Sequence, residues 1–394
     1  MKYITDENRK KIADALFYMA LTIELVLMIV EKSEISFSYE SYVFRVTFLL
    51  TLLAVLFMKH DKKEWIFIAA IWAVSAVSYY ICGKNDMLRV VTFLMAARDI
   101  DLTKAMKYTF YVCIVGFTLI ALLACAGVMG EMIQVADYGR GEGEEARYVF
   151  GFGHPNTLFG SMFVLLLMWI WIYGKKAGIL PYLVMIVSSV IITVLTKSRT
   201  SAVILAATLL LAIVFRLFPK LAAFKVFYIL ETIVSPVICI VTAVLAAGWT
   251  GAMYCGDNFW DLEGDYWKIE TRFNYRMSSI YYEAANRDAV LSRWKLFSAH
   301  GTDSYFDMGW VRLFYWYGII PVVLLVIALL AVIYVCYKKQ DIRALIIIFA
   351  LSVYTIVEAT FVTRYIGRDF FLLIAGVYLG YYFKDKGETD VRES

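Results

Sequence analysis

The sequence predicts an all-α protein that crosses a lipid bilayer about a dozen times, and three observations carry this prediction. Of the 394 residues, 61% are hydrophobic and only 18% are charged, whereas roughly a quarter of the residues of a globular protein are charged. The mean hydropathy of +0.69 is correspondingly high. Apolar runs of about 20 residues, the length that a helix needs to cross a bilayer core, recur along the whole chain. We therefore expect one integral membrane domain over residues 1–394.

Twelve apolar spans are predicted, separated by charged or turn-forming segments. The spans are 12–30, 43–58, 65–82, 86–99, 106–129, 155–173, 180–196, 200–218, 224–248, 308–337, 342–362 and 366–383. The fourth span is short and contains Arg89, and without it the count is eleven. The first span runs into Glu31-Lys32 without a small-residue cleavage site, so we interpret it as a membrane helix and not as a cleaved signal.

The distribution of Lys and Arg predicts the orientation of the chain. Cytoplasmic loops of membrane proteins carry an excess of these residues. With the N-terminus inside, twelve spans make every inner segment basic, including 59–63, 98–107, 216–225 and 338–343, whereas eleven spans do not. Both termini are therefore predicted to be cytoplasmic.

Polar residues concentrate on the predicted outer side, in the long segments 130–154 and 249–307. The inner loops are too short to fold a nucleotide-binding domain. The chain has no GxxxxGK[ST] motif, and the run from Gly151 to Asn156 lacks the third glycine of a dinucleotide-binding motif. A reaction would therefore use a substrate that brings its own leaving group, and no cofactor is expected. The net charge of +4 is too small to indicate a nucleic-acid partner.

No metal site is predicted. The three histidines, His60, His154 and His300, are too scattered for a zinc site. Acidic residues cluster in the large outer segment at Asp257, Asp261, Glu263 and Asp265. This cluster could bind a divalent cation through oxygen ligands, but its spacing is not that of an EF-hand, and we interpret it as a solvated surface.

The first outer segment ends in a motif that leads directly into the sixth span. Gly151 and Gly153 permit tight turns, and Pro155 suits the first turn of a helix. His154 and Asn156 would then lie at the outward N-terminus of that helix, where free N–H groups and the helix dipole favour an anion. The alternative is a capping turn without a ligand.

A short outer turn carries two cations. Lys197 and Arg199 lie between the seventh and eighth spans, on the side where basic residues are disfavoured. The guanidinium of Arg199 presents a planar set of donors that suits phosphate oxygens, and Lys197 adds a point charge. The alternative is that both side chains extend to lipid headgroups.

The last outer turn repeats this pattern with Arg364 and Arg368, which are four residues apart. Their alternative role is ion pairing with Asp369 and Glu358. A carboxylate such as Glu358 inside a predicted span is costly without a partner, so we expect it to pair with an outer arginine; a proton relay is the second interpretation. Glu24 and Arg89 could pair in the same way.

Residues 271–300 are predicted to form one amphipathic helix that lies in the membrane interface. Its apolar residues recur at steps of three and four: Phe273, Met277, Ile280, Ala284, Leu291 and Trp294. Arg272 and Arg276 would share the opposite face. After this helix come three potential proton acceptors for a hydroxyl: His300, Asp303 and Asp307. The aspartates could instead cap the tenth span, and for Asp303 we favour that role.

Three features together resemble the Wzy-type polysaccharide polymerases of the O-antigen polymerase and ligase superfamily. They are the run RYVFGFGHPNTLFG at 147–160, the turn Lys197-Ser-Arg-Thr-Ser, and the tract from Asn274-Tyr-Arg-Met-Ser through Asp307-Met-Gly-Trp to Tyr317-Gly-Ile-Ile. The order of many spans, one large late outer loop and three final helices is also similar, and the resemblance covers residues 85–380. One departure is Ala299-His300-Gly301, where the family often has Phe-Gly, so the role of His300 stays open.

The resemblance implies a glycosyltransferase that lengthens a cell-surface polysaccharide, such as an O-antigen or a capsule, at the outer face of the bacterial plasma membrane. A hydroxyl of one oligosaccharide repeat linked to polyprenyl (undecaprenyl) diphosphate would attack the anomeric carbon of a second chain, and polyprenyl diphosphate would leave. The residues expected to bind the diphosphate are Arg199, Arg276 and Arg364, assisted by Lys197, Arg147 and Arg368. Asp307 or His300 would orient or deprotonate the acceptor hydroxyl, and a metal is not required.

The expected partners are membrane lipids, a flippase that supplies lipid-linked repeats, and a regulator of chain length. Two other functional classes stay open. The first is a ligase of the same superfamily, which transfers a finished glycan to another acceptor. The second is a transporter or flippase of lipid-linked glycans, which would place polar residues near the bilayer midplane, whereas here they gather at the outer rim.

Overall fold

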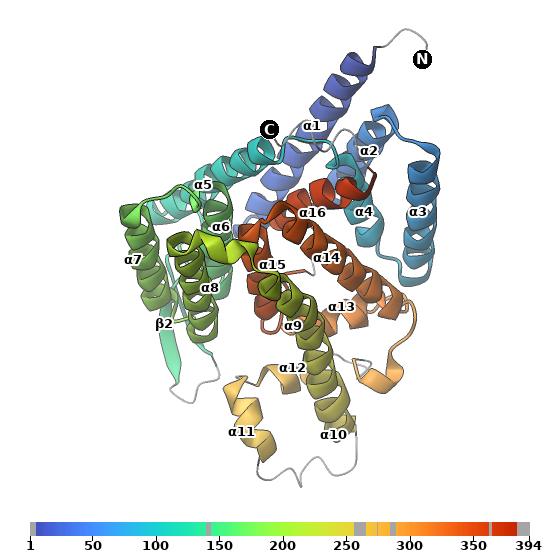
Figure 1. The fold of residues 1–394 in the computed structure, drawn as a ribbon. Helices are drawn as coiled ribbons and strands as arrows, with labels where there is room; N and C mark the ends of the chain where they lie inside the picture. The colour runs from blue at the N-terminus through green and yellow to red at the C-terminus, as the bar shows by residue number, and fades with distance from the viewer. Residues whose placement is uncertain are drawn as a thin grey trace.

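A computed structural model describes residues 5–138, 143–255, 265–273, 275–283, 289–361 and 365–383. Over these ranges the chain forms a bundle of helices with one small β-hairpin (Figure 1). Within these described ranges, nine helical segments are long and apolar enough to cross a membrane. Eight are α1 (Asp6–Lys32), α2 (Glu40–Phe57), α3 (Lys62–Cys82), α5 (Leu102–Cys125), α6 (Pro155–Tyr173), α7 (Ile179–Thr196), α8 (Arg199–Leu217) and α14 (Ile319–Lys339). The ninth is α9 (Lys225–Ala243), which continues through a π-helical turn, Val244–Thr250, into α10 (Gly251–Cys255).

Four shorter helices occupy the other three predicted spans and the first part of the tenth. They are α4 (Asp86–Ala96), α13 (Gly309–Tyr317), α15 (Ile342–Tyr354) and α16 (Phe371–Leu379). At 1.5 Å per residue α4 is about 16 Å long, roughly half the thickness of a bilayer core. The all-α membrane class is thus confirmed, and the count of twelve crossings stays a prediction.

The predicted tenth span is two helices and not one. Gly318 separates α13 from α14, and its φ of 98° is a conformation that a side chain would strain. A Cβ atom here would also lie 2.6 Å from the Cα atom of Phe297. The segment before α13, which was predicted to be outer, therefore packs directly against this break.

The segments predicted as inner loops contact one another. Arg98 donates to the Lys59 carbonyl at 2.9 Å, and Arg216 donates to the Ala177 carbonyl at 2.8 Å. The Trp171 indole donates to Asp341 at 2.9 Å. In Figure 1 the N-terminal end of α1 lies at the top, whereas α10, α11 and α12 lie at the bottom.

Two segments predicted as outer have their own structure. Strands β1 (Ile133–Asp137) and β2 (Glu144–Tyr148) form an antiparallel hairpin in which Gln134 pairs with Arg147. In the large outer segment, α11 (Asp265–Arg272) and α12 (Arg276–Glu283) are short helices.

The prediction of one amphipathic helix over 271–300 is wrong. The chain turns at Tyr275, which has a φ of 58°, and the Glu270 carboxylate accepts a hydrogen bond from the Ser278 backbone N–H at 2.8 Å. A carboxylate at a helix N-terminus favours a new helix there. Residues 294–300 are not helical, because their backbone instead bonds to the break after α13; the Ile319 N–H, for example, donates to the Lys295 carbonyl at 3.0 Å. The apolar spacing correctly identified buried residues, such as Met277 and Ile280, but not a continuous helix.

The buried pair expected from the sequence is present. Arg89 Nη2 lies 2.9 Å from Glu24 Oε1, and the Thr47 hydroxyl donates to the same oxygen at 2.5 Å. This pair ties α4 to α1 and α2, so its role is structural.

Candidate functional site

A polar pocket of about 660 Å³ lies where the hairpin, the first turn of α6, the α7–α8 turn, α11, α12 and the segment before α13 meet. This volume is typical of small-molecule sites. Its lining residues are Tyr138, Arg147, His154, Asn156, Ser198, Arg199, Thr200, Ser201, Thr271, Arg272, Tyr275, Arg276, Ser279, Tyr305, Phe306 and Asp307. Four of them are arginines and one is a carboxylate, so the lining carries an excess of positive charge. Hydroxyl groups make up most of the remaining polar surface.

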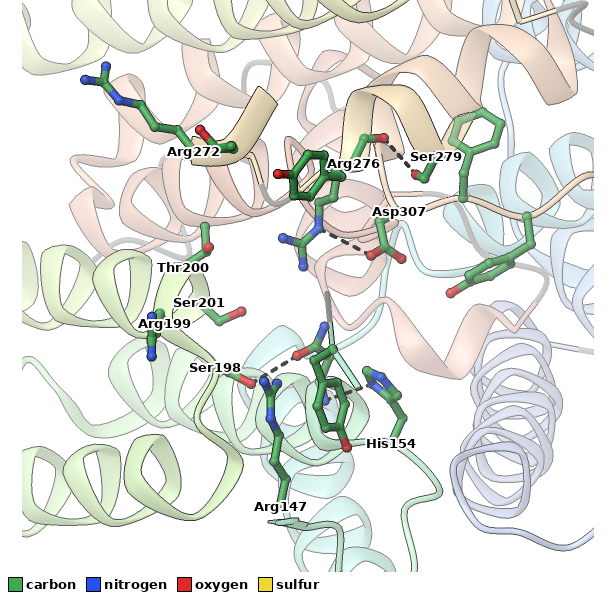
Figure 2. A pocket seen from close by; sticks show the side chains of 16 residues that line it. Arg147, His154, Ser198, Arg199, Thr200, Ser201, Arg272, Arg276, Ser279 and Asp307 are labelled. Atoms are coloured by element: carbon green, nitrogen blue, oxygen red, sulfur yellow. Dashed lines mark hydrogen bonds and ion pairs between the residues drawn. The ribbon is translucent and has the colours of Figure 1, made fainter. Parts of the chain in front are cut away.

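Most of the side chains that the sequence singled out meet in this pocket. Those that line it are Arg147, His154, Asn156, Arg199, Arg272, Arg276 and Asp307. Figure 2 shows the guanidinium groups of Arg276 and Arg147 directed into the pocket from opposite sides, while Arg272 extends away from its centre. These residues come from segments up to 160 positions apart (147 to 307), and only the fold brings them together.

The other predicted site residues lie elsewhere. Lys197 is the exposed C-cap of α7, with a φ of 52°, one residue before the pocket residue Ser198. His300 packs on the α3–α4 turn: a Cβ atom on Gly83 would lie 2.4 Å from its ring. The backbone of Arg368 belongs to a short 3-10 helix, Ile366–Arg368. Arg364 lies outside the described residues.

The predicted turn into α6 has the expected form. Gly151 and Gly153 have φ values of 78° and 67°, and Pro155 is the first residue of α6. His154 is the N-cap, and its Nδ1 accepts a hydrogen bond from the Asn156 backbone N–H at 3.1 Å. A neutral His154 ring must therefore carry its proton on Nε2, where it can donate to a ligand.

The charge state of His154 follows from its surroundings. Desolvation in the pocket lowers the pKa of the imidazole, and Arg147 and Arg276 act in the same direction, whereas Asp307 opposes them. The neutral ring is therefore favoured over the imidazolium. His154 thus serves as a neutral hydrogen-bond donor beside the arginines.

Arg276 joins two carboxylates at the centre of the site. Its Nε lies 3.3 Å from Asp307 Oδ2, and its Nη2 lies 3.6 Å from Glu358 Oε1. Glu358 therefore forms an ion pair with an arginine, as expected, and this arginine belongs to the segment that was predicted to be outer. The N-cap of α13 is Met308, so Asp307 does not occupy the cap position. Its carboxylate instead faces Arg276.

Asn156 connects this ion pair to the α7–α8 turn. Its amide Nδ2 donates to Glu358 Oε1 at 2.9 Å, and its Oδ1 accepts a hydrogen bond from the Ser198 hydroxyl at 3.0 Å. These contacts run from Ser198 through Asn156 and Glu358 to Arg276, and they fix the relative positions of four separate segments. The residue identified as an anion-binding candidate is thus also a structural link.

Asn156→Asp should destabilise the protein by about 2 kcal/mol, the order of magnitude of a hydrogen bond to a charged group, and by more than Asn156→Ala. The aspartate would replace the amide donor with a second carboxylate facing Glu358. The favourable effect of a negative charge near a helix N-terminus, about 0.3–1 kcal/mol, is too small to offset that repulsion. Thermal unfolding of the detergent-solubilised protein measures the difference. Equal unfolding temperatures for the two variants would contradict this role.

Arg147 is held in a compact arrangement on β2. Its Nε and Nη2 donate to Glu145 Oε2 at 3.0 and 2.8 Å, and its guanidinium lies 3.5 Å from the centroid of the Tyr138 ring. Only 3% of the residue is exposed. Glu145 compensates part of its charge, so Arg147 contributes a rigid donor surface to the pocket.

Sequence reasoning missed several lining residues, among them Ser198, Tyr305 and Ser279. It also missed Arg312, a buried arginine on α13 that lies under the rings of Tyr305 and Phe306. Ser198 belongs to the turn Lys197-Ser-Arg-Thr-Ser noted in the sequence, but no spacing distinguishes Tyr305 and Ser279 from the many other hydroxyl and aromatic residues in the chain. Arg312, a charge inside an apolar span, was the one available signal.

An apolar groove of about 480 Å³ lies between α5, α6, α7 and α8. Leu158 and Met162 of α6 line it, together with Phe150 and Phe152 of the turn that leads to His154. The groove thus begins beside the same turn that borders the polar pocket.

Within the described ranges, no group of three or more His, Cys, Asp or Glu side chains is placed to hold a metal ion. Asp257, Asp261 and Glu263 of the acidic cluster lie outside those ranges, and of Asp265 only the backbone is described.

The arrangement suits an amphipathic, anionic ligand. Guanidinium groups bind phosphate oxygens through paired hydrogen bonds, hydroxyls and tyrosines suit a sugar, and Asp307 offers a proton acceptor at the pocket wall. No family model, curated protein or solved structure matches the chain.

Proposed function

We propose that the protein is a glycosyltransferase that polymerises oligosaccharide repeats carried on polyprenyl diphosphate, at the outer face of the bacterial plasma membrane. The observation that carries the proposal is the pocket with four arginines and Asp307. The resemblance of residues 147–160, 197–201 and 274–320 to Wzy-type polymerases supports the same reaction. No cytosolic nucleotide site is needed, because the diphosphate is already on the substrate.

In the proposed reaction, the acceptor hydroxyl oxygen forms a bond to the anomeric carbon of the donor, and the bond from that carbon to the diphosphate oxygen breaks. The leaving diphosphate takes the electron pair. Arg199 and Arg276 stabilise the charge that develops on it, as fixed donors do best. Asp307 accepts the proton of the acceptor hydroxyl.

The pairing between Arg276 and Asp307 predicts that donor binding comes before proton transfer to Asp307. Arg276 contacts both Asp307 and Glu358. A diphosphate in the pocket would compete for the same guanidinium. Binding of the donor would then release the Asp307 carboxylate when the acceptor hydroxyl needs a base.

The apolar groove between α5, α6, α7 and α8 is a suitable position for the polyprenyl chain. A lipid-linked substrate has a charged head and a long hydrocarbon tail, and burial of the tail contributes about 0.8 kcal/mol per CH₂ group. The turn at 150–156 borders both the groove and the pocket. A soluble sugar phosphate has no hydrocarbon tail that could fill the groove.

We also propose twelve membrane crossings with both termini in the cytoplasm. The contacts among 59, 98, 171, 177, 216 and 341 support this topology, because all of these positions belong to or border predicted inner loops. The pocket-lining residues all come from segments predicted to be outer, or from the outer ends of spans.

Cysteine labelling tests the topology. In a variant without native cysteines, Arg140→Cys and Trp260→Cys should react with an impermeant thiol reagent in intact cells. Leu221→Cys should react only after the cells are permeabilised, because it lies in the basic loop 216–225. Labelling of Leu221→Cys in intact cells would reverse the proposed orientation.

A gel of lipid-linked glycans from cells lacking the protein tests the function. A polymerase defect should leave single, unlengthened repeats exposed at the outer face. Full-length but unattached chains would indicate a ligase. Repeats retained at the inner face would indicate a flippase, and either result would replace the proposal.

A further inference from the structure

Arg312 is a buried cation next to the pocket. It lies on α13 and only 2% of it is exposed. Aromatic rings surround its guanidinium: the ring centroids of Tyr305, Trp316 and Phe306 lie 3.8, 5.4 and 5.6 Å from its Cζ. Rings at such distances attract a cation through their electron-rich faces.

Among the described residues, two of the three guanidinium nitrogens of Arg312 form no hydrogen bond, although Tyr305 interacts with the group. Its Nε and Nη2 are buried and have no hydrogen-bond partner in the part of the chain that the structure describes. Leaving charged donors buried and unpaired is costly. These two nitrogens form one edge of the planar guanidinium, so their N–H groups point in the same direction. That edge matches two oxygens of one phosphate or carboxylate.

Two aromatic side chains, those of Tyr305 and Phe306, separate Arg312 from the pocket. Tyr305 and Phe306 line the pocket and also contact Arg312. Phe306 is buried, whereas Tyr305 is 60% exposed. Because most of the surface of Tyr305 faces solvent, a change of its χ1 rotamer would break mainly its contact with Arg312. The charges of Asp307 and Glu358 also act on Arg312.

We propose that Arg312 is a further anion-binding guanidinium of this pocket, covered by Tyr305 and reached when Tyr305 rotates toward solvent. The oxygens of a phosphate or diphosphate would then supply the acceptors that Nε and Nη2 lack. Arg276 and Arg312 would bind the anion from two sides. The identity of the anion rests on the proposed function; the cover by Tyr305 does not.

Chemical modification of the full-length protein in nanodiscs tests the cover. An arginine-specific dicarbonyl reagent, phenylglyoxal, is followed at Arg312 by peptide mass spectrometry. Tyr305→Ala should raise the modification rate of Arg312 at least fivefold, while Tyr305→Phe, which keeps the ring, should match the wild type. Because Tyr305 is mostly exposed, neither change threatens the core. An unchanged rate in Tyr305→Ala overturns the proposal.

Inorganic pyrophosphate tests the ligand. In Tyr305→Ala, saturating pyrophosphate should slow the modification of Arg312 at least fivefold, together with that of Arg276. Protection of Arg276 and Arg199 without Arg312 overturns this inference but leaves the proposed function standing. No protection at any of the three arginines overturns both the Arg312 site and the diphosphate role of the pocket.

Discussion

Asp307→Asn is expected to leave the protein folded and to lower the rate of glycan polymerisation at least a hundredfold, because a general base contributes roughly 10²–10⁴ to a rate. Asn has nearly the same shape as Asp but is a far weaker base. Arg276 would keep its contact with Glu358, so the site should keep its form. Purified protein and a lipid-linked repeat allow rate and substrate binding to be measured separately; the rate should fall while binding is retained.

Asp303 provides the matched control for this experiment. It lies four residues before Asp307 in the same segment, is exposed, and is not among the residues that line the pocket. Asp303→Asn should therefore polymerise at close to the wild-type rate. If Asp307→Asn is as active as Asp303→Asn, Asp307 is not the base, and the search would turn to His154, His300 or the substrate itself.

Arg276→Lys is expected to lower polymerisation by about 10²–10³, the loss typical of removing one fixed donor from a developing charge. Arg276 contacts Asp307 through Nε and Glu358 through Nη2. The single ammonium nitrogen of Lys cannot span both carboxylates and also present a planar edge to a phosphate. Because the net charge is unchanged, a simple loss of electrostatic attraction would not account for such a fall.

Arg272 is the matched control for Arg276. It lines the same pocket, but it is exposed and its side chain extends away from the centre (Figure 2). Arg272→Lys should lower polymerisation less than tenfold, since exposed charge pairs contribute little. Equal losses in both variants, measured at equal protein levels in the membrane, would mean that the pocket needs only its total charge and not the geometry of Arg276.

Local sequence determined the elements and the ends of many of them. Hydropathy located α6, α7 and α8 to within one residue at each end, because a bilayer demands a fixed length of apolar helix. The turn into α6 was equally predictable, since Pro155 suits the first turn of a helix and the two glycines can adopt the positive φ that the turn requires. The pairing of Glu24 with Arg89 followed from the cost of a charge in an apolar span.

Tertiary contacts decided the rest. The spacing of Phe273, Met277 and Ile280 favours a helix, but it carries no information about Glu270, whose carboxylate starts a new helix at Arg276. Hydropathy likewise cannot show which of the outer residues meet. Asn156 bonds to Glu358, 202 positions away, whereas His300, seven residues from Asp307, packs against Gly83. The sequence by itself thus determined a helical membrane protein and singled out the four arginines that line the pocket. Only packing between distant helix ends decided which cations form one pocket, because such contacts depend on side-chain shape and on the relative positions of helices, which no local pattern records.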